Sequence, residues 1–389
     1  MLANQKILAG KQRLLPRSFK VAEFFAGIGL VRLALEQQGW DVLFANDIDP
    51  DKAEMYRQNW SKGDHLVVGD IHAIKADDVP PCDLFTASFP CNDLSIAGRW
   101  DGLNGKESSA FWGLIRIIRD LGERRPPFVM LENVVGFLMS HGGNDLEQAL
   151  LALNELGYAV DAFILNAMHW APQSRARLFI VAKLNNGLVC QPFATKSEIR
   201  PESLIQFINT HQNIWWDIQK LPSPPKPCKH LHDMLEDLPD DNPQWWNKDR
   251  SNYFMNQLSA KHLVLAKLMI GGRKFTYATA FRRVRNGKSM AELRTDGIAG
   301  CLRTPRGGSG RQILFKAGRG KYQVRLLTAR ECARLQGVPD SYVINVPLNQ
   351  ALFGFGDAVC VPAIEWIAKH YLTPATKAFH QRQMQLFQD

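Results

Sequence analysis

Three short motifs carry side chains that suit covalent or acid–base chemistry. Cys91 follows an apolar run that ends in Ser88-Phe89-Pro90, and Glu132 ends another apolar run. Arg175 and Arg177 stand two residues apart, so an extended chain places them on one face. A cysteine is more often an inert buried side chain, and the arginines also fit a surface pair on an edge strand. Together the four residues indicate a thiol nucleophile with an acid and a cation beside it.

The elements that would position these residues alternate between strand and helix. The predicted strands are Phe19–Phe25, Val42–Ala45, Asp83–Ser88, Phe128–Leu131, Tyr158–Leu165 and Leu178–Ala182. The predicted helices are Leu30–Gln38, Asp51–Trp60, Phe111–Leu121, Leu146–Leu156, Thr328–Leu335 and Val361–His370. This alternation predicts an open, mostly parallel α/β sheet with helices on both faces. Ligands bind outside the carboxyl ends of such strands, and the polar stretch 92–109 after Cys91 has the composition of a mobile lid.

A second ligand site is predicted at the ends of the first strands. Gly27 and Gly29 follow the first strand, where glycines permit a tight turn and close backbone approach. Asp47 ends the second strand, where a carboxylate can accept ribose hydroxyls, and Gly69-Asp70-Ile71 follows it. The third glycine of a dinucleotide fingerprint is replaced by Arg32, which suits a nucleoside without phosphates. A purely structural turn is the alternative, but three such clusters in order favour an adenosyl ligand.

Basic charge is concentrated in one segment. Between Trp246 and Arg325 there are 18 Lys or Arg against three acids, a balance of +15. Since the whole chain carries +9, the remainder carries −6. Aromatic residues, among them Phe275 and Phe281, stand between these cations. A solvated basic face is the alternative, but this pattern favours a polyanionic partner.

Several classes of protein are disfavoured by the bulk sequence. No apolar run approaches the roughly 20 residues of a membrane helix, so no membrane is expected as a partner. The first residues lack the apolar block of a signal peptide. The seven cysteines include no CxxC pair, so neither a metal site nor a disulfide framework is expected. These features predict a cytoplasmic protein. The Pro-rich stretch Leu221–Pro227 marks a boundary loop before the basic segment, which is poor in long helical patterns.

The order of the motifs resembles that of the DNA (cytosine-5)-methyltransferase family. Eight segments occur in the family's order: EFFAGIGLVRLALEQQGW, AND, GDI, SFPCNDLS, ENVVGFL, APQSRARLF, RLLTARECARLQGVPDSY and GFGDAVCVPAIEWIA. Each segment is moderately specific by itself, and the ordered set covers nearly the whole chain outside the basic segment. Asn92, Glu23 and Asp357 depart from the Gln, Asp and Asn that are common in the family. None of these departures removes a group that the reaction needs.

The resemblance implies a role for each motif residue. Cys91 is expected to add to C6 of a flipped cytosine, Glu132 to bind its N3 edge, and Arg177 to hold O2 with Arg175 in support. S-adenosylmethionine is the implied cofactor. Its pocket is expected to include Phe25, Ala26, Gly27, Gly29, Asp47, Ile48, Asp70, Ile71, Pro90, Asp357, Ala358 and Val359.

The resemblance also implies an architecture and partners. A Rossmann-like S-adenosylmethionine-dependent methyltransferase domain is expected over residues 1–235 and 346–389, with a smaller basic target-recognition domain over 236–345. Double-stranded DNA is the expected substrate, bound by a monomer, and a cognate restriction endonuclease is a candidate partner. Two alternatives stay open: an RNA (tRNA) cytosine-5 methyltransferase, and a catalytically silent DNA-binding homologue.

Overall fold

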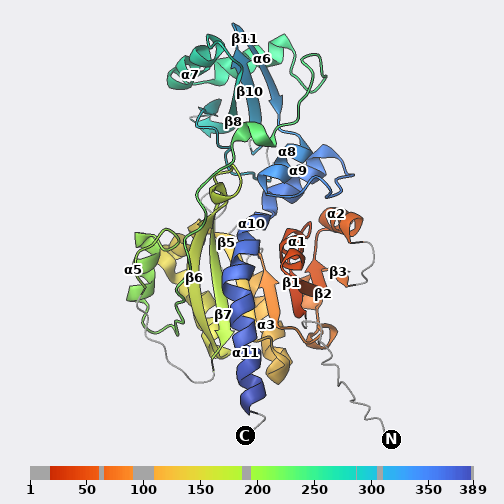
Figure 1. Cartoon of the computed structure of the whole chain (residues 1–389), viewed down its shortest axis with the longest axis vertical. Coiled ribbons are helices and arrows are strands. Elements are labelled where there is room, and N and C mark those ends of the chain that lie inside the picture. The colour runs from red at the N-terminus through yellow and green to blue at the C-terminus, as the bar shows by residue number, and fades with distance from the viewer. Residues whose placement is uncertain are drawn as a thin grey trace, which may run out of the picture.

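The protein consists of a seven-stranded unit and a smaller four-stranded unit stacked end to end (Figure 1). The computed structural model describes residues 18–60, 65–90, 109–185, 194–285, 287–304 and 310–386. Cys91, Asn92 and all but the last residue of the expected lid lie outside the described residues.

The seven-stranded sheet is parallel except for one strand. Its order is β3 (Leu66–Val68), β2 (Trp40–Asp47), β1 (Phe19–Phe24), β4 (Leu84–Ala87), β5 (Phe128–Val134), β7 (Ala176–Leu184) and β6 (Tyr158–Asn166). β7 pairs antiparallel with both β5 and β6, and the other pairs are parallel. The predicted open, mostly parallel sheet is therefore confirmed. Because β7 lies inside the sheet, the alternative of an arginine pair on an edge strand is wrong.

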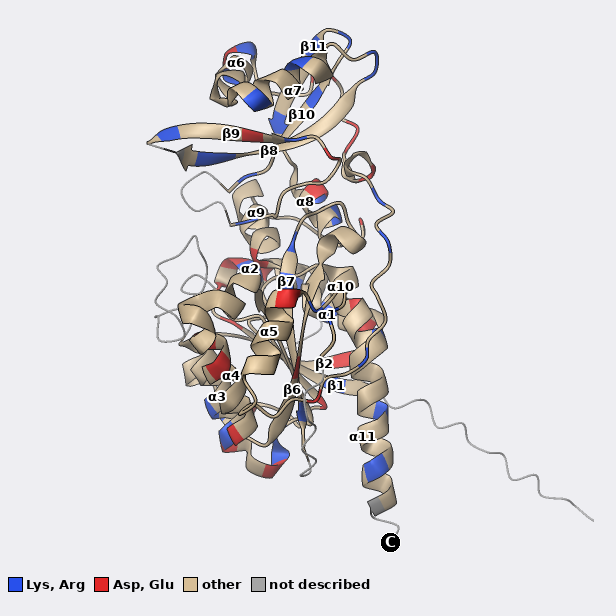
Figure 2. Ribbon diagram, turned by 90° about the vertical axis from the view of Figure 1, so that its left-hand side faces the viewer, with Lys and Arg blue, Asp and Glu red and all other residues tan. Residues whose placement is uncertain are grey.

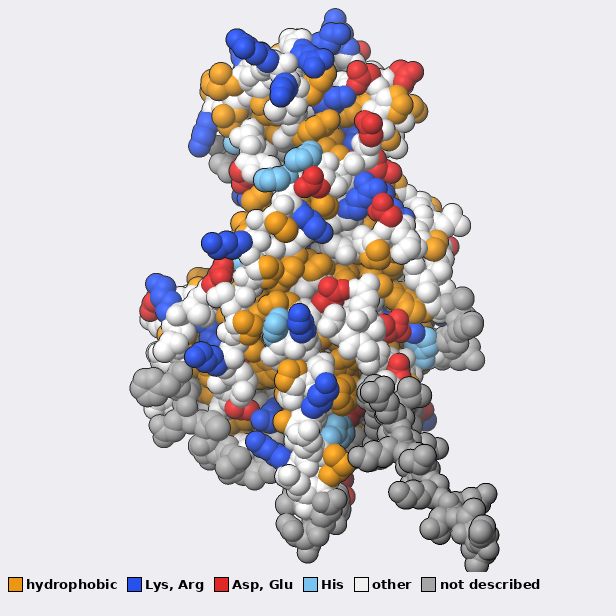
Figure 3. Space-filling view, viewed as in Figure 1, with side chains coloured by type: hydrophobic (Ala, Val, Ile, Leu, Met, Phe, Trp, Pro, Cys, Tyr) orange, Lys and Arg blue, Asp and Glu red, His pale blue; other side chains and the backbone are white. Residues whose placement is uncertain are grey.

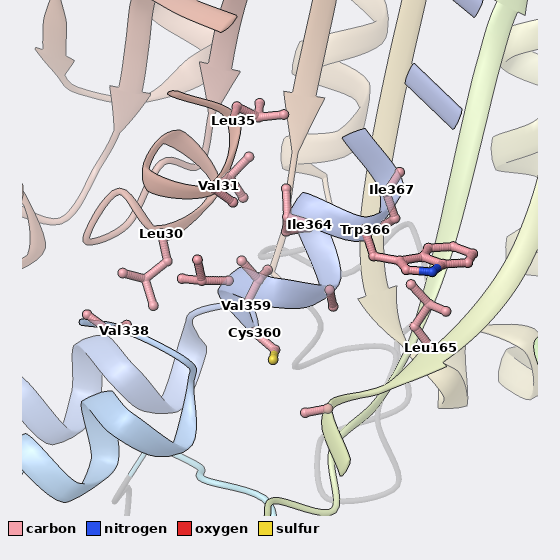
Figure 4. Close-up of a cluster of buried hydrophobic side chains, with 14 of the residues drawn as sticks. Leu30, Val31, Leu35, Leu165, Val338, Val359, Cys360, Ile364, Trp366 and Ile367 are labelled. Carbon is pink, nitrogen blue, oxygen red and sulfur yellow. The ribbon is translucent and has the colours of Figure 1, made fainter. Parts of the chain in front are cut away.

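Helices cover both faces of this sheet and form two separate cores. One core contains β5 side chains such as Phe128 and Met130 together with α1 (Leu30–Gln37) and α10 (Val361–Ile367). Figure 4 shows Val31 of α1 in the same cluster as Ile364 of α10 and Val359, which lies two residues before α10. The other core packs the opposite face against α3 (Ala110–Leu121), α4 (Asn144–Glu155) and α5 (Glu202–Thr210). α2 (Pro50–Asn59) flanks β2 and β3.

The last predicted helix is longer than its pattern suggests. α10 passes through a π-helical turn, Ala368–Leu372, into α11 (Thr373–Leu386). Pro374 has no N–H to donate, which disfavours a continuous helix, and it lies two residues after the end of the π-helical turn. The run Leu348–Gln385 is apolar enough to resemble a membrane span, yet 72% of its most apolar window is buried inside the protein. The most apolar window of this run therefore belongs to the core.

The four-stranded unit (residues 246–326) is antiparallel. Its order is β11 (Lys321–Leu326), β10 (Ile313–Gly318), β8 (Thr276–Arg285) and β9 (Lys288–Arg294). α6 (Lys248–Gln257) and α7 (Ala260–Ile270) pack on one face and enclose a separate core around Phe254 and Phe315. The sequence pattern of the basic segment did not predict these two helices. α7 buries only Ala266, so its apolar residues do not form the stripe by which a helix is recognised.

A buried ion pair joins the two units. The Arg325 guanidinium at the end of β11 donates to both Glu331 oxygens, at 2.7 and 2.5 Å, and both side chains are almost fully buried. Glu331 lies in α8 (Ala329–Leu335), whose apolar side chains belong to the core of the seven-stranded unit. The same carboxylate accepts the Thr328 N–H in the predicted capping box and the N–H of Glu236. α9 (Leu348–Asp357) packs beside α8.

Removing one member of this pair should destabilise the protein strongly. Glu331→Gln leaves the Arg325 guanidinium buried without its counter-charge, and such changes cost about 3–5 kcal/mol. Urea unfolding followed by circular dichroism measures the loss. Lys196→Ala is the control, because the Lys196–Glu202 pair is exposed and exposed pairs contribute little. Equal unfolding midpoints for Glu331→Gln and the wild-type protein would contradict the structural importance of the buried pair.

Candidate active site

An acid and a guanidinium meet at the carboxyl end of β5. The Arg177 Nε lies 3.0 Å from a Glu132 oxygen, and both side chains are largely buried. The antiparallel register aligns Glu132 with Phe179, so Arg177 is the diagonal neighbour on the same face of the sheet. Arg177 is the second residue of β7. Because β7 runs antiparallel to β5, its first residues lie beside the carboxyl end of β5. The predicted proximity of the acid and the cation is thus present.

The described segment that ends at Pro90 is bound to the strand end that carries Glu132. The Asn133 amide, next to Glu132, donates to the Phe89 carbonyl at 3.3 Å. Phe89 is buried and packs against Phe111 and Phe137. The last described residue before the gap, Pro90, is partly buried. The strand end that carries Glu132 therefore also anchors the segment that leads to the predicted nucleophile.

Arg175 is held differently from Arg177. Its side chain is 2% exposed, and its guanidinium donates to the carbonyls of Leu302, Gly356 and Ala358 at 2.8, 3.1 and 2.7 Å. Burial, followed by the charge of Arg177, lowers the pKa of Arg175. Arg175 is therefore a buried cation held mainly by backbone carbonyls, one from the segment that follows β9 and two from the last motif.

A thiol that sequence reasoning missed lies between the two arginines. The Cys301 sulfur is 3.3 Å from an Arg175 nitrogen and 4.0 Å from an Arg177 nitrogen. Burial acts to raise its pKa, but the charges of Arg175, Arg177 and Arg303 outweigh burial and leave the pKa below its usual value. No motif surrounds Cys301 in the sequence, and only the fold brings it beside Arg177.

The strand-end clusters of the second predicted site are tied together by hydrogen bonds. The Asp47 carboxylate accepts the N–H groups of Gly27 and Asp49 at 2.7 and 2.8 Å. The neighbouring Asn46 side chain donates to the Gly69 carbonyl at 2.9 Å. Asp70 accepts the His72 N–H at 2.9 Å and begins a short 3-10 turn that contains the buried Ile71. The ends of β1, β2 and β3 therefore form one continuous rim.

The loop after β1 is shaped by left-handed residues. Phe25, Gly27 and Gly29 have φ values of 57°, 57° and 80°. A Cβ added to Gly29 would lie 2.4 Å from the Trp60 ring, whereas a Cβ added to Gly27 would have no other atom within 4 Å. Ala26 holds the loop through its N–H, which donates to the Asn46 carbonyl. Gly29 is thus required by packing, whereas Gly27 faces open space on the rim.

The last motif closes the rim from the far end of the chain. Lys52 of α2 forms a 2.6 Å ion pair with Asp357. The nearby Gly354 approaches Ile28 so closely that a Cβ would lie 2.7 Å from its side chain. Val359 is buried in the same core as Leu30 (Figure 4). The residues expected around a cofactor are therefore neighbours in the fold, and Ile48 adds a side chain that is 65% exposed.

Glu23 is a further buried acid that motif reasoning did not assign to the site. It lies in β1 beneath the loop, is 1% exposed, and neither carboxyl oxygen makes a hydrogen bond. Burial raises its pKa to about 8, although Arg32 opposes the shift.

Among the described residues, no group of three or more His, Cys, Asp or Glu side chains is arranged to hold a metal ion.

Comparisons with known proteins agree with this arrangement. A family model described as C-5 cytosine-specific DNA methylase matches residues 19–373. The type II methyltransferase M.HhaI of Haemophilus parahaemolyticus is 30% identical over 355 residues, which cover 89% of this chain and 92% of that protein. M.NlaX of Neisseria lactamica is 30% identical over 358 residues, covering 90% and 95% of the two chains.

Solved structures share the fold at lower sequence identity. The crystal structure of the Schizosaccharomyces pombe (S. pombe) Dnmt2 methyltransferase superposes with a TM-score of 0.61 at 21% identity, covering 92% of this chain and 99% of that one. A putative DNA modification methyltransferase encoded within an Escherichia coli (E.coli) prophage gives 0.54 at 19% identity, covering 90% and 98%.

The lowered pKa of Cys301 predicts selective alkylation. A thiol reacts as its thiolate, so iodoacetamide should label Cys301 at neutral pH faster than Cys82, a partly exposed thiol whose pKa burial raises to about 12. Arg177→Met removes a positive charge, raises the pKa of Cys301 and slows its labelling. Peptide mass spectrometry across a pH series measures both rates. Equal labelling of Cys301 in the two proteins would contradict the electrostatic argument.

Proposed function

Because the chain belongs to the family of C-5 cytosine-specific DNA methylases, we propose that it methylates a flipped-out cytosine at C5 through a covalent bond from Cys91 to C6. The observation that carries this proposal is the Glu132–Arg177 pair. It lies at the strand end that also anchors the Phe89 carbonyl, two residues before Cys91. A cytosine inside a duplex hides C6, so the base must leave the helix to reach this pair.

Glu132 and Arg177 have complementary tasks in the proposed pocket. Arg177 holds the cytosine O2 with its donors, while Glu132 binds the exocyclic amine and, when protonated, gives a hydrogen bond to N3. Both interactions strengthen as negative charge develops on the ring during attack at C6, which is how preorganised groups lower a barrier. Buried side chains suit this role, because little water competes with the substrate.

Cys91 makes C5 reactive by covalent catalysis. Its thiolate forms a bond to C6 as N3 takes a proton from Glu132, which leaves C5 enamine-like and able to accept a methyl group. Once C5 carries the methyl group, loss of the C5 proton to water, cleavage of the carbon–sulfur bond and return of the N3 proton to Glu132 restore the aromatic ring, the thiolate and the acid. Two guanidiniums, Arg175 and Arg177, flank this end of β7, and their charge favours the thiolate form of a nearby cysteine.

The rim at the ends of β1, β2 and β3 suits S-adenosylmethionine, which supplies the methyl group when bound. Gly27 faces open space, so a ligand can approach its backbone. We assign Asp47 to the ribose and Asp70 to the adenine edge, and the exposed Ile48 side chain would offer an apolar face to the adenine ring. The buried carboxyl group of Glu23 lies in β1 beneath the loop.

We assign DNA recognition to the four-stranded unit within residues 236–345. Its exposed cations are Lys248, Arg250, Lys261, Lys267, Arg273, Lys274, Arg283, Lys288, Arg303, Arg319 and Lys321. Figure 3 shows Lys and Arg side chains over its outer end, and Figure 2 shows β8 and β9 projecting as a long hairpin. Arg250 and Arg282 lie over the Trp246 ring at 4.2 and 5.5 Å. Most of these cations are expected to contact phosphates, which position a protein on DNA.

The proposed cellular role follows from these relatives. We infer that the enzyme acts in the cytoplasm as a monomer on double-stranded DNA. The type II methyltransferases among its relatives support a pairing with a cognate restriction endonuclease, whose cleavage the methyl group would block.

Replacing Cys91 tests the proposed nucleophile. Wild-type protein should transfer label from S-adenosylmethionine to cytosine in unmethylated DNA and should form a denaturant-stable adduct with a 5-fluorocytosine duplex. Cys91→Ser should lose the adduct and reduce transfer by at least a hundredfold, because the serine hydroxyl stays protonated at neutral pH. Scintillation counting and gel electrophoresis measure the two outcomes.

Cys228→Ser is the control for this experiment, since Cys228 is exposed and should leave both outcomes unchanged. Full methyl transfer by Cys91→Ser would contradict the covalent mechanism. Label in transfer RNA but not in DNA would indicate that the substrate is RNA. Duplex binding without transfer by the wild-type protein would indicate a silent homologue.

Replacing Gly27 tests the proposed cofactor pocket. Gly27→Ala adds a Cβ into the open space of the rim, so the Kd of S-adenosylhomocysteine should rise at least tenfold in calorimetric titrations. Gly39→Ala is the matched control: Gly39 also has positive φ, 81°, and open space around its Cβ, but it lies between α1 and β2. Both variants carry a similar backbone penalty of about 1–2 kcal/mol. Equal Kd values for the two would refute the assignment.

A further inference from the structure

A buried polar network runs from the four-stranded unit to the proposed cofactor rim. Its side chains are Gln173 and Gln336, both fully buried, and Arg175. Gln173 and Arg175 precede β7, and Gln336 directly follows α8. Residues 297–304, which follow β9, are called the link. The main partners of the three side chains are backbone groups of the link and of the motif at 355–358. Arg175 is expected to support the base site, but none of these contacts requires a substrate.

The network binds both backbone groups of Leu302 in the link. The Gln173 side-chain oxygen accepts the Leu302 N–H at 3.0 Å, and the Arg175 guanidinium donates to the Leu302 carbonyl at 2.8 Å. The backbone adds two bonds, from Ser174 N–H to the Ala299 carbonyl and from Ala299 N–H to the Pro172 carbonyl. The position of the link is therefore set by the residues just before β7.

Two of these side chains, Arg175 and Gln336, also bind the motif at 355–358, which closes the rim. The Ala358 carbonyl accepts from both Arg175, at 2.7 Å, and the Gln336 amide, at 3.1 Å. Gln336 also donates to the Phe355 carbonyl at 2.7 Å and accepts from the Gln173 amide at 3.2 Å. Arg175 thus bonds both the link and the motif at 355–358, and Gln173 and Gln336 connect the same two segments through the hydrogen bond between their amides. Neither segment can shift without breaking buried hydrogen bonds.

Direct backbone contact adds to the connection. A Cβ on Gly356 would lie 2.6 Å from the Arg303 carbonyl carbon, so the link and the rim pack backbone against backbone. Arg303 is exposed and belongs to the basic segment that is assigned to DNA. A displacement of the link on DNA binding would therefore reach the Gly356–Ala358 backbone with no flexible side chain between them to absorb it.

We propose that Arg175, Gln173 and Gln336 are positioning residues that couple DNA binding to cofactor binding. This inference rests on the proposed function, because it takes the rim as the cofactor site and the link as part of the DNA contact. DNA that orders the link also orders the rim, so each ligand strengthens the binding of the other. Thermodynamic linkage requires the two enhancements to be equal. Partly broken buried networks are costly, which favours the state with all bonds made.

Calorimetry of the full-length protein tests the coupling. The Kd of S-adenosylhomocysteine is measured alone and with saturating fragments of enzymatically amplified, unmethylated genomic DNA. The wild-type Kd should fall at least fivefold with DNA. Arg175→Lys keeps the charge but loses the planar fork, and Gln336→Met removes the amide at similar volume. In both variants the ratio of the two Kd values should approach one.

Arg200→Lys is the matched control, because Arg200 is an equally buried arginine bound to Asp161 of β6, away from the network. It should keep the wild-type ratio, and thermal unfolding verifies that all three variants fold. A wild-type ratio retained in folded Arg175→Lys and Gln336→Met, or a ratio of one in the wild-type protein, overturns the proposal. Neither result affects the Cys91 assay, so failure of the coupling and failure of the proposed reaction are distinguishable.

Discussion

The reversed direction of β7 is the constraint on which the site depends. In a sheet of parallel strands, only carboxyl ends meet at the edge where ligands bind. β7 runs the other way between β5 and β6, so its first residues, not its last, reach that edge. Arg177 therefore meets Glu132 at 3.0 Å, and Arg175 lies beside the motif that closes the rim. A parallel β7 would carry both arginines to the opposite end of the sheet.

Buried arginines perform two different tasks in this fold. Arg325 is neutralised by Glu331 through two hydrogen bonds, and the pair fixes how the four-stranded unit joins α8. Arg175 is instead surrounded by backbone carbonyls. Carbonyl dipoles compensate a buried charge less well than a carboxylate does, which is why burial lowers the pKa of Arg175. Arg325 joins the two units through an ion pair, whereas Arg175 joins Leu302 to the motif at 355–358 through hydrogen bonds to carbonyls.

The chemistry of the site divides along the sheet. The acidic rim at β1, β2 and β3 collects carboxylates from strand ends that are far apart in sequence, and the base pocket at β5 and β7 collects guanidiniums. Glu23 and Asp47 lie on one side, and Arg177 and Cys301 on the other. The acidic side chains therefore lie toward the proposed cofactor rim, and the guanidiniums lie toward the proposed base pocket.

Local sequence determined six strands of the seven-stranded sheet, most of the helices beside it, the cap at Thr328 and the order of the motifs, because periodicity, glycine turns and strand-end acids act over a few residues. It did not reveal β3, α5, α9 or α11. It could not reveal the helices α6 and α7, since α7 has no clear apolar stripe. Nor could it reveal Cys301 beside Arg177, or the grip of Arg175 on carbonyls more than 120 residues away. Those contacts depend on strand order and on the packing of two units, which only the tertiary structure decides.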